Sequence, residues 1–175
     1  MRFSLETNRL RLRPFSLADA PFVIELLNDP GWLRFIGDRN VRTIADAEAY
    51  IESRIIAQQQ RVGYSLLRVA RKDTDEPVGM CGLVRRDGLD DADIGFALLA
   101  RHAGKGYAHE AARAVMHETD VTHRIERVVA ICDPDNRASI RLLEKLGFTF
   151  EKTVRLPKDD MDLKLFARAR PTGDQ

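Results

Sequence analysis

Apolar and polar residues alternate with the two-residue period of a β-strand at the start of the chain. Leu5, Leu10 and Leu12 lie among charged residues in LETNRLRLRPF, and this pattern predicts a first strand that ends near Pro14. Apolar positions then recur at helical spacing behind Asp19, the expected N-cap, until the breaker sequence NDPGW at 28–32. The residues 42–60 carry a second helical pattern.

The middle and the end of the chain carry six further strand patterns and two further helices. The strand patterns cover 64–70, 77–86, 92–100, 125–132, 148–156 and 161–167. Helices are predicted at 107–119 and 137–146, the second closed by Gly147. This order predicts a mixed α/β fold, with a mostly antiparallel sheet of about seven strands and helices on both faces.

The length and the charge of the chain limit the possible functions. The chain has 175 residues, of which 44% are hydrophobic, enough for one domain with a substantial core. We expect a single domain over 1–170 and a flexible C-terminal tail over 171–175. The formal net charge is +1, and no stripe combines basic and aromatic side chains, so neither nucleic acid nor a membrane surface is an expected partner.

The spacing of the cysteines and the lack of a targeting signal predict a cytoplasmic protein. Cys81 and Cys132 are far apart in the sequence, which predicts neither a disulfide framework nor a metal site. The first 15 residues lack the apolar core of a signal peptide, and no stretch approaches the length of a membrane span.

The segment RHAGKG, residues 101–106, lies between a predicted strand and a predicted helix. Such a junction leaves several backbone N–H groups unpartnered, with the positive end of the helix dipole behind them, and Gly104 and Gly106 allow an anion close approach. A dinucleotide fingerprint would need a third glycine where His109 stands, and a nucleotide P-loop would need Ser or Thr after Lys105. The pattern therefore favours a phosphate cradle of another kind, although a glycine pair alone also fits an ordinary tight turn.

A second helix start follows the next predicted strand. The sequence DPDNRASIRLLEKLGF, residues 133–148, places Asn136 and Ser139 at the mouth of this helix. Two helix mouths that follow neighbouring strands can converge on one extended ligand. Together the two segments indicate a site for a long anionic molecule.

These two motifs resemble those of the GNAT superfamily of acyl-CoA-dependent N-acetyltransferases. RHAGKG fits the RxxGxG pattern of the superfamily, and NRASIRLLEKLGF fits its second motif, in the same order and at a similar separation. The segments ETNRLRLRPFSLADA, NDPGWLRFIGDR and ADIGFALLARHAGKGYAHEA are similar to a narrower subgroup, which contains the N-terminal (alanine) acetyltransferases of ribosomal proteins. The resemblance runs from about Glu6 to Phe166.

The resemblance implies a GNAT fold, in which the twisted sheet is splayed into a V, and acetyl-CoA as the co-substrate. The cofactor would lie between the strand that ends near Leu99 and the strand that ends near Cys132. Backbone groups of Leu98 and Leu99 would pair with its pantetheine arm, and Asn136 would contact the arm from the other side. The pyrophosphate would be held by N–H groups of Ala103, Gly104, Lys105, Gly106, Tyr107 and Ala108.

The resemblance also implies direct transfer of an acetyl group to a primary amine, without a metal. We expect an α-amino group of a protein, peptide or amino-acid-like molecule, because deprotonating it at pH 7 costs about 1 kcal/mol, against about 4.6 kcal/mol for a lysine. A small amine or an antibiotic is an alternative acceptor. A non-catalytic acyl-CoA-binding or sensing domain is the alternative from another class, and a homodimer is a possible assembly.

The catalytic groups depart from the pattern of the superfamily, in which a tyrosine often donates a proton to the leaving thiolate. This sequence has Leu143 at that position, so Ser139, one turn earlier, is the predicted donor, with water as the competitor. Asp93 is the predicted base, which would act through a water; the alternative is that Asp93 is a solvated carboxylate at the edge of a strand. Glu151 is a second candidate for the base. Cys132 could carry an acyl group, but apolar packing is favoured because no histidine lies near it in sequence.

Bulky apolar side chains gather just after the breaker NDPG, in a predicted loop. Trp32, Leu33 and Phe35 either fill the core beneath this loop or form a wall of the acceptor pocket. Under the second hypothesis Trp32 and Phe35 bind the substrate. The sequence RLPKDDMD at 155–162 resembles an acceptor-side loop between the last two strands.

Overall fold

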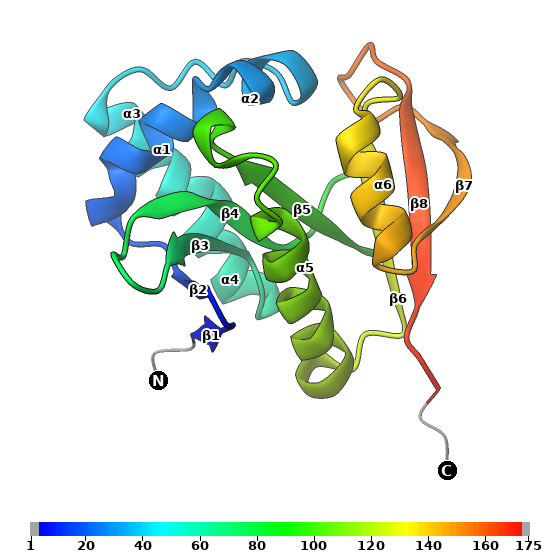
Figure 1. Cartoon of the computed structure of the whole chain (residues 1–175). Coiled ribbons are helices and arrows are strands. Elements are labelled where there is room, and N and C mark those ends of the chain that lie inside the picture. Colours follow the sequence, from blue (N-terminus) through cyan, green and yellow to red (C-terminus); the bar gives the residue numbers. More distant parts are fainter. Residues whose placement is uncertain (1–3, 173–175) are drawn as a thin grey trace.

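One sheet of eight strands runs through the computed structural model, which describes residues 4–172 (Figure 1). The strands are β1 (Leu5–Glu6), β2 (Leu10–Pro14), β3 (Leu66–Arg71), β4 (Pro77–Val84), β5 (Ala92–Leu98), β6 (Arg127–Cys132), β7 (Thr149–Val154) and β8 (Leu163–Ala169). Their order in the sheet is β1-β2-β3-β4-β5-β6-β8-β7. The mixed α/β class and the mostly antiparallel sheet are confirmed.

The sequence pattern predicted about seven strands and not eight, because the segment predicted as the first strand forms a hairpin of two strands, β1 and β2. The N–H of Thr7 donates to the carbonyl of Leu10 at 2.9 Å, and the Thr7 Oγ1 accepts from the N–H of Leu10, also at 2.9 Å. These bonds turn the chain between β1 and β2, so that Leu5 pairs with Leu12. A local turn is hard to see in a short run of alternating residues.

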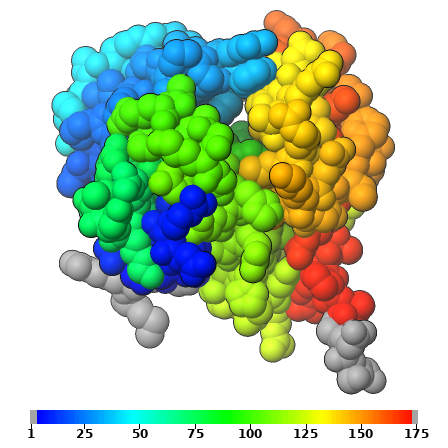
Figure 2. Space-filling view, viewed as in Figure 1, coloured from blue at the N-terminus to red at the C-terminus, as the bar shows by residue number. Residues whose placement is uncertain are grey.

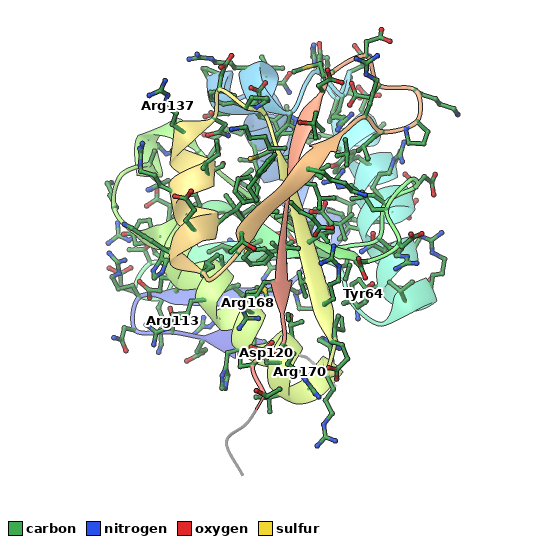
Figure 3. The ribbon with its side chains drawn as sticks, turned by 90° about the vertical axis from the view of Figure 1, so that its right-hand side faces the viewer. Tyr64, Arg113, Asp120, Arg137, Arg168 and Arg170 are labelled. Carbon is green, nitrogen blue, oxygen red and sulfur yellow. The ribbon has the colours of Figure 1, made fainter. Side chains whose placement is uncertain are left out.

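The sheet opens into a V between its two central strands. β5 and β6 run parallel, and only two residue pairs join them, Ala92 with Val128 and Asp93 with Val129. Beyond Asp93 the two strands diverge, whereas β2 to β5 on one side and β6, β8 and β7 on the other remain antiparallel ladders. Opposite the opening, Arg168 of β8 forms a two-pronged ion pair with Asp120, at 3.0 and 2.8 Å, which holds the closed end of the V (Figure 3).

Helices cover both faces of the sheet, as expected. One face carries α1 (Ala20–Leu27), α2 (Pro30–Phe35), α3 (Ile44–Tyr50) and α4 (Ala57–Val62), and the other carries α5 (Tyr107–Glu118) and α6 (Arg137–Lys145) (Figure 1). The shorter helical segments are η1 (Leu17–Asp19), η2 (Ile51–Ile56), η3 (Ala100–His102) and η4 (Thr119–His123). None of the helices within residues 4–172 is both long and apolar enough to cross a bilayer.

One local prediction about the first helices holds only in part and another was wrong. Asp19 occupies the N-cap position of α1, as predicted, but its side chain makes no capping bond to this helix. Its carboxylate instead accepts from Arg13 at 2.7 and 2.8 Å and from the N–H of Ser16. The segment after NDPG is the helix α2 and not a loop: Asp29 caps it by accepting from the N–H of Gly31, and the proline occupies its first position.

The predicted tail at the C-terminus falls partly outside the described residues. β8 ends at Ala169, and residues 171 and 172 belong to no helix or strand. The remaining residues, 173–175, lie outside the described part of the chain.

Candidate active site

The loop between β5 and α5 has the backbone of an anion cradle. Gly104 and Gly106 have φ angles of 76° and 81°, in the left-handed region that favours glycine. A methyl group built on Gly104 would meet no atom within 4 Å, so this position requires glycine for its backbone conformation and not for lack of space. The alternation of these two glycines turns successive N–H groups toward one side of the loop.

Most of the predicted N–H donors are free for a ligand. The first bond of α5 runs from the N–H of Glu110 to the carbonyl of Gly106 at 3.1 Å. Among residues 4–172, the N–H groups of Gly104, Lys105, Gly106, Tyr107 and Ala108 have no acceptor. The prediction that Ala103 binds the pyrophosphate is wrong, because its N–H donates to the carbonyl of Ala100 and closes the turn of η3. The remaining donors lie at the positive end of the helix dipole, an arrangement that suits a pyrophosphate.

Two acidic side chains fasten this loop to the rest of the fold. The carboxylate of Asp29 accepts from the N–H of Ala100 at 3.0 Å. His102 is buried, and its Nε2 lies 3.0 Å from Glu76 Oε1 in the turn between β3 and β4. The Nδ1 of His102 is buried without a partner among the described residues. The loop is therefore held from both sides before any ligand binds.

The two predicted backbone contacts to the pantetheine arm differ in availability. The N–H of Leu99 donates to the carbonyl of Val78 at 2.9 Å, so this amide belongs to the ladder with β4. Since backbone groups alternate in direction along a strand, those of Leu98 point away from β4, toward the opening of the V. The expectation for Leu98 fits this geometry, whereas the N–H of Leu99 is already used.

Asn136 and Ser139 lie on the other arm of the V, as expected from the second motif. The Oδ1 of Asn136 accepts from the N–H of Ser139 at 3.2 Å, so Asn136 caps α6. Ser139 precedes Leu143 by one turn on the same face of α6, and Leu143 is 1% exposed in the core shared with α5. Figure 2 shows the surface hollowed between α5 and α6.

Asp93 lies at the base of the V and is buried, with 1% exposure. The alternative of a solvated strand-edge carboxylate is therefore wrong. Ala92 and Ile94 pack in the core beneath α5, so alternation turns Asp93 to the opposite face of the sheet. Burial raises the pKa of Asp93, and the guanidinium of Arg86, which donates to its Oδ2, offsets part of the rise. Its Oδ1 has no partner among residues 4–172.

The sequence missed Arg86, which donates to Asp93, and Tyr50, which lies within reach of the charge of Arg86. Arg86 follows β4 and reaches Asp93 across the β4–β5 hairpin. Burial raises the pKa of Tyr50 in α3, and the nearby positive charges of Arg39, Arg86 and Arg54 lower it in part. A basic residue just after β4 was the only signal in the sequence, and it becomes informative only once the hairpin register is known.

Neither Glu151 nor Cys132 fits the chemical role considered for it. Glu151 lies on the edge strand β7, separated from β6 by β8, and it accepts from Arg127 at 2.6 Å. Cys132 is 9% exposed at the end of β6, and burial raises the pKa of its thiol to about 11. At neutral pH it is a protonated, poorly nucleophilic thiol, in agreement with a packing role.

Of the two side chains predicted to bind the substrate, Trp32 instead fills the core, which was the alternative hypothesis. Trp32 is 7% exposed, packs in the core with α1 and α3, and donates from Nε1 to the carbonyl of Gly37 at 3.1 Å. Phe35 is partly exposed, with the guanidinium of Arg34 4.7 Å from its ring centroid. Leu33 and Ile36 are each 41% exposed and are the stronger candidates for a wall that meets a substrate.

No group of three or more His, Cys, Asp or Glu side chains that could hold a metal ion occurs among the described residues. The polar side chains at the opening of the V are instead single groups on separate elements. Asp93 lies on one face of the sheet and Ser139 on the other, so a molecule that threads the V would have a carboxylate on one side and a hydroxyl on the other.

Comparison with known proteins agrees with this geometry. The chain is 34% identical over 155 residues to the uncharacterized protein YkkB of Bacillus subtilis, covering 86% of this chain and 88% of that one. An acetyltransferase from Agrobacterium tumefaciens superposes with a TM-score of 0.81 at 25% identity, covering 96% of this chain and 95% of that chain. RimL, a ribosomal L7/L12 alpha-N-protein acetyltransferase solved with coenzyme A, superposes with a TM-score of 0.81 at 22% identity, over 95% and 98% of the chains.

Residues 9–149 match the acetyltransferase (GNAT) domain family, and these residues include β2 to β6, α5 and α6. The match therefore covers every element that forms the cradle and the opening beside it. The chain belongs to the GNAT family of N-acetyltransferases.

Proposed function

We propose that this N-acetyltransferase moves an acetyl group from acetyl-CoA directly to the α-amino group of a protein, peptide or amino-acid-like molecule. The observation that carries the proposal is the row of free N–H groups of Gly104 to Ala108 beyond the end of β5, together with Asp93 at the base of the V. RimL, which superposes over nearly the whole chain, acts on the α-amino group of a protein, and this supports the choice of acceptor.

Acetyl-CoA would supply an activated acyl group as a thioester. The N–H groups of Gly104, Lys105, Gly106, Tyr107 and Ala108 would hold its pyrophosphate, and the backbone of Leu98 would pair with its pantetheine arm. Asn136 caps α6 on the opposite arm and keeps that wall of the opening in place. These residues would bind and orient the donor. The proposal also places the protein in the cytoplasm.

Asp93 is the proposed base. An ammonium group cannot attack a carbonyl carbon, so a proton must leave the amine before or during transfer. The carboxylate is the active form, and burial has raised its pKa, which makes it a stronger base than an exposed aspartate. Arg86 donates to Oδ2 of Asp93, whereas Oδ1 is buried and has no partner among the described residues. The water or amine that gives up its proton would have to enter the base of the V beside this oxygen.

Ser139 is the proposed proton donor to the departing thiolate, on the face of the sheet opposite Asp93. Within residues 4–172 no hydrogen bond engages its hydroxyl, whereas its N–H donates to Asn136 Oδ1. Leu143 is buried at the position where a tyrosine often stands in the superfamily, so the donor must come from elsewhere. A water next to Ser139 is the competing donor.

The acceptor is tested with a panel of amines at pH 7.5 and saturating acetyl-CoA, with transfer detected by mass spectrometry. We expect peptides with a free α-amino group to be acetylated at the N-terminus. Matched peptides with a blocked N-terminus and one internal lysine should react at least about 10-fold more slowly, because the lysine is harder to deprotonate. Transfer to aminoglycosides or small polyamines with none to peptides would replace this acceptor by a small amine.

A further inference from the structure

The turn between β1 and β2 contacts the phosphate cradle, although about a hundred residues separate the two in sequence. Arg9 donates from Nη1 to the carbonyl of Lys105 at 2.9 Å and from Nε to Glu110 Oε2 at 2.7 Å. Its guanidinium carbon lies 4.6 Å from the centroid of the Tyr107 ring. One side chain thus contacts the loop, its first helical residue and the first turn of α5.

Glu110 is held on its other oxygen by the same turn. Its Oε1 accepts from Thr7 Oγ1 at 2.5 Å and from the N–H of Arg9 at 2.9 Å. Partial burial would raise the pKa of Glu110, but these hydrogen bonds from Thr7 and Arg9 lower it on balance. Glu110 is therefore a carboxylate at neutral pH, placed in the first turn of the helix whose N-terminus forms the cradle.

A carboxylate at this place opposes the binding of an anion. It lies at the positive end of α5 and would repel a diphosphate at the neighbouring N–H groups. Arg9 compensates this charge through a direct ion pair whose side chains are 47% and 20% exposed. The Nη2 of Arg9 has no partner among the described residues, and it would lie 3.3 Å from a methyl group at Gly106, so positive charge remains at the edge of the cradle.

We propose that Arg9 is a positioning residue for the donor: it fixes the phosphate loop through Lys105 and cancels the charge of Glu110. This inference rests on the proposed function, because it concerns the affinity of the same cradle for CoA. Arg9 lies at one end of the cradle, whereas Asp93 lies at the base of the V. Its loss therefore weakens binding of the donor and leaves the chemical step intact.

The test compares Arg9→Ala with Arg11→Ala, a second arginine on the same hairpin whose side chain bonds to Glu6 and to no residue of the loop. The affinity for CoA is measured by calorimetry, and kcat and KM for acetyl-CoA by steady-state kinetics. We expect Arg9→Ala to raise Kd and KM by about 10- to 100-fold, the range for losing a charge-assisted hydrogen bond, with kcat within about twofold. Arg11→Ala should leave all three close to the wild type.

A double variant separates the charge effect from a general loss of structure. Arg9→Ala combined with Glu110→Gln should regain part of the lost affinity, because the uncompensated carboxylate is gone. The defect of the single variant should also shrink as salt is raised, since salt screens the repulsion between Glu110 and the phosphates. A purely structural role for Arg9 predicts no gain from the second substitution and no salt dependence.

The outcomes are distinct. If the wild type binds CoA and Arg9→Ala binds it equally well, the role of Arg9 is refuted and the proposed function stands. If the wild type itself does not bind CoA, both proposals fail. If Arg9→Ala does not fold, Arg9→Lys replaces it, because a lysine keeps the positive charge but cannot make both hydrogen bonds of Arg9. The Kd of Arg9→Lys for CoA should be higher than that of the wild type but less than about 100-fold higher. A Kd equal to that of the wild type would overturn the inference.

Discussion

Asp93→Asn lowers kcat by about 10²- to 10⁴-fold, the range for loss of a general base, and changes the KM for acetyl-CoA little. The substitution keeps the shape of the side chain at the base of the V and removes its ability to accept a proton. Because burial raises the pKa of Asp93, the kcat/KM of the wild type should rise with pH through that raised value, and this limb should be absent from the variant. Steady-state kinetics across pH measure both effects.

The control for this variant is Asp91→Asn, two residues earlier, where the carboxylate accepts from Arg127 at 2.9 Å and is partly exposed. It should retain nearly full activity. Stability gives a second check: a carboxyl whose pKa is raised in the folded state stabilises at low pH, and that contribution is lost as pH climbs from 3.8 through the raised value. The Tm of Asp93→Asn should therefore improve relative to wild type as pH rises. A variant with unchanged kcat would mean that the base lies elsewhere.

Gly104→Val weakens the binding of acetyl-CoA by about 100-fold or more, equivalent to about 2.7 kcal/mol. Gly104 has a φ of 76°, a region that a β-branched residue avoids, so the loop must rearrange and its N–H groups turn away from the pyrophosphate. Calorimetric titration with CoA measures the loss.

The matched control for this strain is Gly63→Val. Gly63 has a φ of 83°, ends α4, and like Gly104 has open space around a built methyl group. Both variants should lose similar amounts of stability, but only Gly104→Val should lose affinity for CoA. Equal affinity in the two variants would contradict the assignment of the loop as the phosphate cradle.

The order of strands and helices could be predicted because the apolar periodicity of each element is local. The glycine junction was also predictable, since a left-handed backbone at Gly104 and Gly106 leaves a direct mark on the sequence. The short helix α2 was missed because a proline has two opposite meanings in a sequence: it breaks a helix in the interior but is favoured at the first helical position. Only the hydrogen bond from the N–H of Gly31 to Asp29 shows that Pro30 begins a helix.

The site was less predictable wherever it depends on contacts between distant residues. Asp93 follows a run of acidic residues and reads as solvated, yet the parallel pairing with β6 buries it, and Arg86 reaches it from the neighbouring strand. The direction of the N–H of Leu99 follows from its register with Val78, which sequence alone does not give. The contact of Arg9 with Glu110 joins opposite parts of the chain and has no local signature.

Thermal unfolding with and without acetyl-CoA is the first measurement to make on this protein, because it requires no knowledge of the acceptor. A ligand that binds only the folded state, at about 100 times its Kd, stabilises by about 2.7 kcal/mol, which for a chain of 175 residues raises Tm by about 5–11 °C. We expect this shift with acetyl-CoA and with CoA, and no shift with NAD or ATP. No shift, or an equal shift with NAD or ATP, would contradict the cradle and the proposed transferase activity with it.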